Sequence, residues 1–85
     1  MKVIELKCEN PHFVHMYNGA KLCEVREIRD RKFEKGCYLL LREYNAESDY
    51  YSGHSMLVHV THILTDARYV KKGYCIMSVK VIIYD

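Results

Sequence analysis

Three strand-like runs in the second half of the chain place the strongest constraint on its fold. Residues 37–44 are the most apolar run, residues 55–64 form a long run, and residues 74–84 are rich in β-branched side chains. A polar turn at 45–49 and a loop at 65–73 separate the runs. Because β-branched and aromatic residues favour strands, and short connections favour antiparallel neighbours, these runs predict consecutive strands of one sheet.

A strand and a short helix are expected before these runs. Residues 2–7 alternate in polarity, as in a strand with one face buried. Asn10 and Pro11 have the residue types of a helix N-cap and a first helical position, and Gly19 suits a helix end. The apolar residues between them share one helical face at i, i+3 and i+4 spacing: Phe13, Met16 and Tyr17. A helix of about two turns is stable only when such a face packs on a sheet.

The whole chain has the size of one domain. Its 85 residues are too few to bury a second core, and its composition is that of a globular protein, 49% hydrophobic and 28% charged. The order of elements predicts an α+β fold over residues 1–85, a small curved barrel of about five mostly antiparallel strands with one short helix after the first strand. Since no apolar run has transmembrane length and no secretory signal is evident, we expect a cytoplasmic protein.

The residue types that bind metals do not form a known site pattern. The four cysteines include no Cys-x-x-Cys pair: Cys8, Cys23, Cys37 and Cys75. The last three lie in strand-like apolar runs and are expected to be reduced and mostly buried. His59 and His62 are three residues apart on an expected strand, which places them on opposite faces. His12 and His15 share a helical face without a third ligand nearby. The sequence therefore predicts neither a metal nor a cofactor.

One charged cluster has the character of a binding site. Residues 21–28 are expected to form the second strand, after the helix. Because side chains alternate along a strand, Glu24 and Arg26 project from one face, and Lys21 at the turn reaches the same side. The opposite face is expected to be the apolar support of the cluster: Cys23 and Val25. An ordinary solvated ion-pair cluster is the simpler interpretation, and it would contribute about 1 kcal/mol at most.

The segment Gly19-x-Lys21-x-x-Glu24-x-Arg26 resembles the G-x-K-x-x-E-x-R signature of ASCH domains (activating signal cointegrator homology), which belong to the PUA-like superfamily. Further blocks resemble a short bacterial and phage branch of that superfamily over nearly the full chain: residues 5–7, 30–31, 39–44, 51–53, 60–61, 63–64 and 73–74, with Phe13, Phe33 and Gly36. The chain departs from that branch at Ile4, where a histidine is usual, at residues 27–29, and at Cys37, where an aspartate is usual.

The resemblance implies a PUA-like β-barrel with a cleft beside the helix, lined by Lys21, Glu24 and Arg26. PUA-like domains mostly bind RNA, so the expected function is binding of single-stranded RNA, or of a nucleotide-like ligand, in this cleft. Arg26 then offers a planar fork to a phosphate or a base edge, and Lys21 offers a mobile charge. Glu24 either accepts from a nucleobase amino group or holds the two cations in place.

Two loops carry further candidates for RNA contacts. The cations of the loop 29–35 that could contact phosphates at the cleft rim are Arg29, Arg31 and Lys32. The loop 65–73 combines cations with an aromatic side chain: Arg68, Tyr69, Lys71 and Lys72. Such loops either bind the RNA backbone in a salt-dependent way or are simply solvated. Packing on the sheet, rather than base stacking, is expected for three other tyrosines: Tyr44, Tyr50 and Tyr51.

Two other functions stay open at the level of sequence. Some ASCH proteins act on modified nucleosides or cleave RNA, and a small hydrolase of that kind would use Lys21 and Glu24 as its catalytic residues. A strongly shifted pKa in a closed pocket would indicate such an enzyme. A phage-type module that binds a protein partner would instead present an exposed apolar patch and a symmetric dimer.

Overall fold

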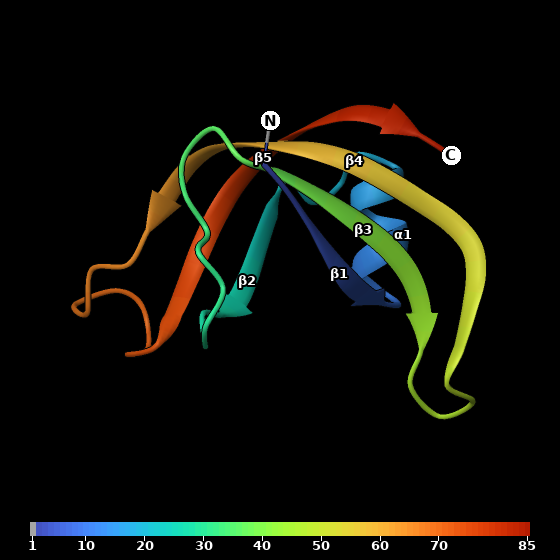
Figure 1. Cartoon of the computed structure of the whole chain (residues 1–85), viewed down its shortest axis with the longest axis horizontal. Coiled ribbons are helices and arrows are strands. Elements are labelled where there is room, and N and C mark those ends of the chain that lie inside the picture. The colour runs from blue at the N-terminus through green and yellow to red at the C-terminus, as the bar shows by residue number, and fades with distance from the viewer. Residues whose placement is uncertain (1) are drawn as a thin grey trace.

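The computed structural model describes residues 2–85 as one five-stranded sheet with a short helix (Figure 1). Its elements in chain order are β1 (Val3–Glu9), α1 (His12–Tyr17), β2 (Cys23–Glu27), β3 (Tyr38–Asn45), β4 (Tyr50–Leu64) and β5 (Tyr74–Tyr84). The strand order is β1-β3-β4-β5-β2, so β1 and β2 are the two edges. β1 runs parallel to β3, and the other neighbouring strands are antiparallel. In residues 2–85, no helix has the length and apolar character needed to cross a bilayer.

The sheet curls into a half-barrel, and its two edge strands lie on either side of an open seam (Figure 1). Along its pairing with β5, β4 shifts register between Leu57 and Val58 and again between Val60 and His62. Bulges of this kind bend a strand and increase its twist. The predicted fold, with about five mostly antiparallel strands and one helix after the first strand, is confirmed, and the sheet stops short of closing.

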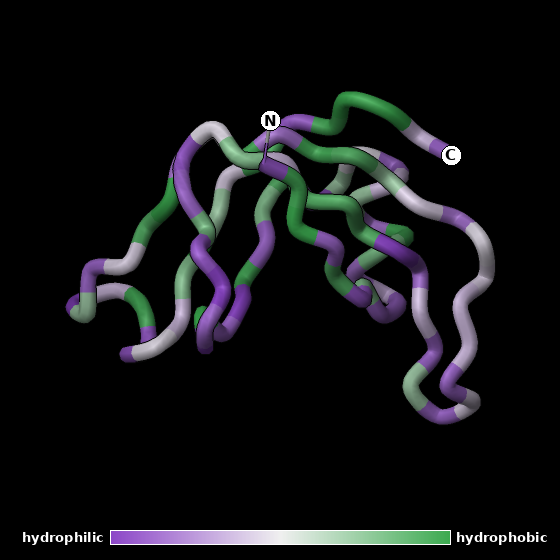
Figure 2. The backbone as a smooth tube through the Cα atoms, in the orientation of Figure 1, coloured by the Kyte–Doolittle hydropathy of each residue, from purple (hydrophilic) through white to green (hydrophobic). Residues whose placement is uncertain are grey.

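The core lies on the inner side of the curl, beneath the arch of strands in Figure 1. Alternate residues of the three inner strands are buried there: Leu39, Leu41, Met56, Val58, Val60, Cys75, Met77 and Val79. Phe13 and Met16 of α1 are also buried, whereas Tyr17 is 43% exposed and contacts the edge of the Tyr84 ring. Figure 2 shows hydrophobic residues where the strands cross the top of the arch and hydrophilic residues in the loop 29–35 and the β3–β4 hairpin.

Several element boundaries differ from the sequence prediction. β1 continues past residue 7 to Glu9 because it pairs with β3 along its whole length. β4 begins at Tyr50, before the predicted residue 55, and β2 covers only part of 21–28. The helix begins at His12, so Pro11 takes the N-cap position that was predicted for Asn10. Asn10 lies one residue earlier, and its Oδ1 atom accepts a hydrogen bond from the Val14 amide at 3.1 Å.

The predicted placement of His59 and His62 on opposite faces is wrong. The second bulge of β4 inserts one extra residue after Val60, so that Val60 and Ile63 both face the core. His59 and His62 therefore lie on the same outer face, opposite two exposed β5 residues: Lys80 and Ser78. Even so, residues 2–85 contain no group of three His, Cys, Asp or Glu side chains placed to hold a metal ion.

Candidate functional site

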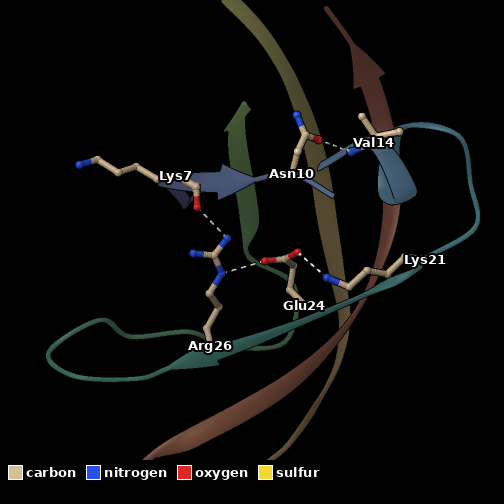
Figure 3. A network of polar contacts seen from close by, with 6 residues as sticks. All are labelled: Lys7, Asn10, Val14, Lys21, Glu24 and Arg26. Carbon is tan, nitrogen blue, oxygen red and sulfur yellow. Dashed lines mark hydrogen bonds and ion pairs between the residues drawn. The ribbon is translucent and has the colours of Figure 1, made fainter. Parts of the chain in front are cut away.

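Glu24 is the only buried charged side chain among residues 2–85, with 2% of its surface exposed. β2 pairs with β5 in a register that sets Glu24 opposite Met77, a core residue, and this register points the carboxylate inward. Its Oε1 atom lies 3.4 Å from the Lys21 Nζ atom, and its Oε2 atom accepts a hydrogen bond of 2.8 Å from the Arg26 Nε atom (Figure 3). The structure therefore brings together the three residues of the sequence cluster.

The predicted apolar support on the opposite face of β2 is wrong. Val25 is 54% exposed and Cys23 is only half-buried, because the outer face of this edge strand is in solvent. The charged face is the buried one. Burial of Glu24 is tolerated because two cations and their hydrogen bonds compensate the desolvated carboxylate.

Arg26 joins the two edges of the half-barrel. Its Nη2 atom donates a 2.9 Å hydrogen bond to the Lys7 carbonyl oxygen of β1, while the Lys7 side chain points away from the cluster (Figure 3). Within residues 2–85, the hydrogen bonds of the Arg26 guanidinium come from its Nε and Nη2 atoms. The side chains of Arg26 and Lys21 are 20% and 24% exposed. Both cations therefore keep N–H donors for a ligand while Glu24 fixes their positions.

A cleft of about 350 Å³ opens beside this cluster, at the seam. Its walls are residues 7–9, His12, Lys21, Glu24, Val25 and Arg26. Burial raises the pKa of the Cys8 thiol to about 11, and the nearby Glu24 carboxylate adds to the rise. The Cys8 thiol is therefore protonated at neutral pH and is a poor nucleophile. Sequence reasoning missed the contributions of Glu9 and His12, because only the curl of the sheet brings β1 and α1 beside β2.

The basic loop residues lie outside the walls of this cleft. Arg29 pairs with Glu27 at 2.6 Å and Arg68 pairs with Asp66 at 2.8 Å, and these partners hold the pKa values of the two carboxyl groups below their usual range. Exposed residues of the two loops include Lys32, Tyr69, Lys71 and Lys72.

Arg31 is less accessible than the other loop cations. It donates a hydrogen bond to the Glu27 carbonyl oxygen, and its guanidinium lies 5.0 Å from the centre of the Phe33 ring. Phe33 packs against the core. The two loops approach each other where the Ile28 amide donates to the Gly73 carbonyl oxygen at 2.8 Å. Arg29, Arg31 and the cations of the loop 65–73 are therefore at the far end of β2 from Lys21.

A second cavity, of about 480 Å³, adjoins the cleft and shares Glu9 as a wall residue. We call it the acidic cavity, since its walls are Glu9, Asn10, Glu43, residues 44–47, Tyr50 and Ser52. Glu43 accepts hydrogen bonds of 2.6 Å from both Ser52 Oγ and Asn10 Nδ2, and these donors lower the pKa of its carboxyl group. The sequence did not suggest this cavity, because it depends on the parallel pairing of β1 with β3.

The three tyrosines near this cavity differ in their packing. The rings of Tyr44 and Tyr51 lie 5.1 Å apart, and Arg42 lies 3.9 Å from the centre of the Tyr51 ring. These two rings pack on the sheet, as predicted. Tyr50, by contrast, is 63% exposed at the wall of the acidic cavity, so the packing prediction is wrong for this residue.

A comparison with known protein families matches the part of the chain that contains both cavities. A family model described as a domain of unknown function (DUF3850) matches residues 3–79. This range contains α1, β1 to β4, part of β5 and every wall residue of the cleft and of the acidic cavity. No curated protein matches the chain. Since the family model accounts for most of the sequence, the chain belongs to the DUF3850 family.

Proposed function

We propose that this chain is a PUA-like domain of the ASCH type that binds RNA, or a nucleotide-like ligand, in the cleft at the seam. The observation that carries the proposal is the buried Glu24, 2% exposed, which holds Lys21 and Arg26 at the wall of that cleft. A buried ion cluster is weak evidence for stability, because a well-packed apolar replacement is often as stable. Three charges gathered at an open cleft are better explained by recognition of a charged ligand.

The contacts of Glu24 favour one of the two roles considered for it. Each carboxylate oxygen already faces one cation, and the side chain is 3% exposed. Glu24 is therefore a positioning residue for Lys21 and Arg26 and does not itself contact the ligand. Arg26 presents its planar guanidinium and Lys21 its ammonium group, which are the usual partners of a phosphate.

The dimensions of the cleft favour a single nucleotide unit. Its volume of about 350 Å³ lies near the lower end of the range of small-ligand sites, about 300–1,000 Å³. A nucleotide from a single strand or from the end of a strand places its phosphate and sugar in such a site, whereas duplex RNA hides its base edges. The basic loops lie apart from the cleft, so we assign them only to flanking phosphates of a longer strand.

The same geometry favours binding over hydrolysis. Cys8, the thiol at the cleft wall, stays protonated at neutral pH because its pKa is about 11. Lys21 and Glu24, the pair that a hydrolase would use, contact each other, and both oxygens of Glu24 have partners.

A fluorescence-anisotropy titration with short single-stranded RNA at two salt concentrations tests the proposal. We expect wild-type protein to bind, with an affinity that falls as salt rises. Lys21→Ala should weaken binding about tenfold, the effect of one lost contact with a charged group. Lys80→Ala, which removes an exposed lysine of β5 away from the cleft, is the matched control. The proposal is wrong if wild-type protein does not bind at low salt, or if the two variants lose the same affinity.

A further inference from the structure

The cleft and the acidic cavity are adjacent and have opposite chemistry. The cleft presents the donors of Lys21 and Arg26, while the acidic cavity presents Glu9, Glu43 and Glu47. Glu43 stays ionised because Ser52 and Asn10 donate to its two oxygens and lower its pKa. A phosphate is attracted to the first space and repelled from the second, so a ligand that spans both has only one favourable orientation.

We propose that the acidic cavity is the nucleobase subsite of the ligand that binds in the cleft, and that it selects bases with an exocyclic amino group over uracil. This inference rests on the proposed function and extends it. With its phosphate beside Lys21 and Arg26, the nucleotide directs its base past Glu9, the wall residue common to both spaces.

Selection follows from the acceptors that line the acidic cavity. Carboxylate oxygens accept hydrogen bonds and cannot donate them, so they pair with the amino groups of adenine, cytosine and guanine. Uracil instead presents two carbonyl oxygens and one N–H group. Its carbonyl oxygens lose their water partners without gaining donors from the glutamates, and an unpaired polar group is unfavourable. Glu9 and Glu47 are the exposed carboxylates of this set, and Glu47 lies in the hairpin between β3 and β4.

Tyr50 supplies the face on which a base stacks. It is 63% exposed at the wall of the acidic cavity, unlike Tyr44, whose ring packs against Tyr51. Stacking on an aromatic ring tolerates any base. Tyr50 is therefore expected to contribute affinity, while the carboxylates contribute the choice of base.

Isothermal titration calorimetry with AMP, CMP and UMP tests the inference on the full chain. We expect AMP and CMP to bind about tenfold more tightly than UMP, the effect of one hydrogen bond to a charged group. Glu47→Gln should reduce this ratio, and Glu34→Gln, which makes the same charge change far from the cavity, should leave it unchanged. Tyr50→Ala should weaken all three nucleotides by a similar factor, about fivefold or more. Urea unfolding of each variant establishes that it is folded.

Three results would overturn the inference. Equal binding of the three nucleotides to wild-type protein excludes base selection, and an equal effect of Glu47→Gln and Glu34→Gln on the ratio excludes the cavity as its source. Absence of binding by any of the nucleotides excludes a nucleotide subsite altogether. The RNA titration of Lys21→Ala decides the proposed function independently, because RNA binding that depends on Lys21 without any preference for a base supports the cleft and rejects the base subsite.

Discussion

Replacement of Arg26 by alanine is expected to destabilise the fold more than its position on an edge strand suggests. The substitution removes the 2.8 Å hydrogen bond to Glu24 and the 2.9 Å hydrogen bond to the Lys7 carbonyl oxygen. It leaves a carboxylate that is 2% exposed with one cation at 3.4 Å. Removing one partner of a buried ion pair lowers the free energy of unfolding by about 3–5 kcal/mol. Because Arg26 is 20% exposed and Lys21 remains beside Glu24, we expect a smaller loss of about 2–3 kcal/mol. In a domain of this size, that loss lowers Tm by about 10–20 °C.

Urea unfolding followed by circular dichroism measures this effect, with an unchanged m-value as the sign of a pure stability change. Arg29→Ala is the control, because its pair with Glu27 is shorter, 2.6 Å, but the arginine side chain is 72% exposed. Fully exposed pairs of this kind contribute little to stability, because solvent screens them. Adding Glu24→Gln to Arg26→Ala should restore part of the stability, since the neutral amide removes a buried charge that Lys21 alone compensates only in part. The reasoning is refuted if Arg26→Ala costs no more than Arg29→Ala, or if the added Glu24→Gln destabilises further.

Three further predictions concern the cysteines and the corrected faces of β2. At pH 8 a thiol reagent should modify Cys23 first, because the other three cysteines are buried, and Cys23→Ser should abolish this fast phase. The free energy of unfolding should fall as pH rises from 9 to about 11, because the folded state keeps the Cys8 proton over this range while the unfolded state loses it. Urea titrations at several pH values measure this dependence, and Cys8→Ala should make it weaker. Leu41→Ala should destabilise by about 2–5 kcal/mol and Val25→Ala by about 0.5 kcal/mol or less, as unfolding curves will show, because Leu41 is fully buried and Val25 is exposed.

Elements with a strong local pattern were predicted well from the sequence. The last strand has the bounds 74–84 in both the prediction and the structure, because its β-branched residues follow the turn signal of Gly73. The helix ends close to Gly19, which has a φ of +83°, a conformation that suits glycine. The bulges in β4 escaped prediction because they depend on pairing with β5. For that reason the prediction of the sheet face on which His62 lies was wrong.

The candidate site likewise has a part that the local sequence predicts and a part that depends on contacts between distant segments. Lys21, Glu24 and Arg26 are close in sequence, so the alternation of a strand was enough to predict that they lie together. Which face of the strand is buried could not be read from Cys23 and Val25, because a carboxylate with two cations replaces the usual apolar face. Glu9 and the acidic cavity depend on β1 lying parallel to β3, a contact between distant segments.

The open seam links the fold to the proposed function. In a closed barrel, backbone hydrogen bonds between β1 and β2 would bring their chains to the usual strand spacing of about 4.8 Å. Here the Arg26 side chain bridges the edges instead, through its hydrogen bond to the Lys7 carbonyl oxygen. That bridge needs the edges to stay apart, and the space beside it is the cleft. Glu24 is buried because it orients this bridging arginine from within. The incomplete barrel therefore leaves the space in which we propose that a ligand binds, and two of the charges at the seam, Lys21 and Arg26, are those that we expect to bind it.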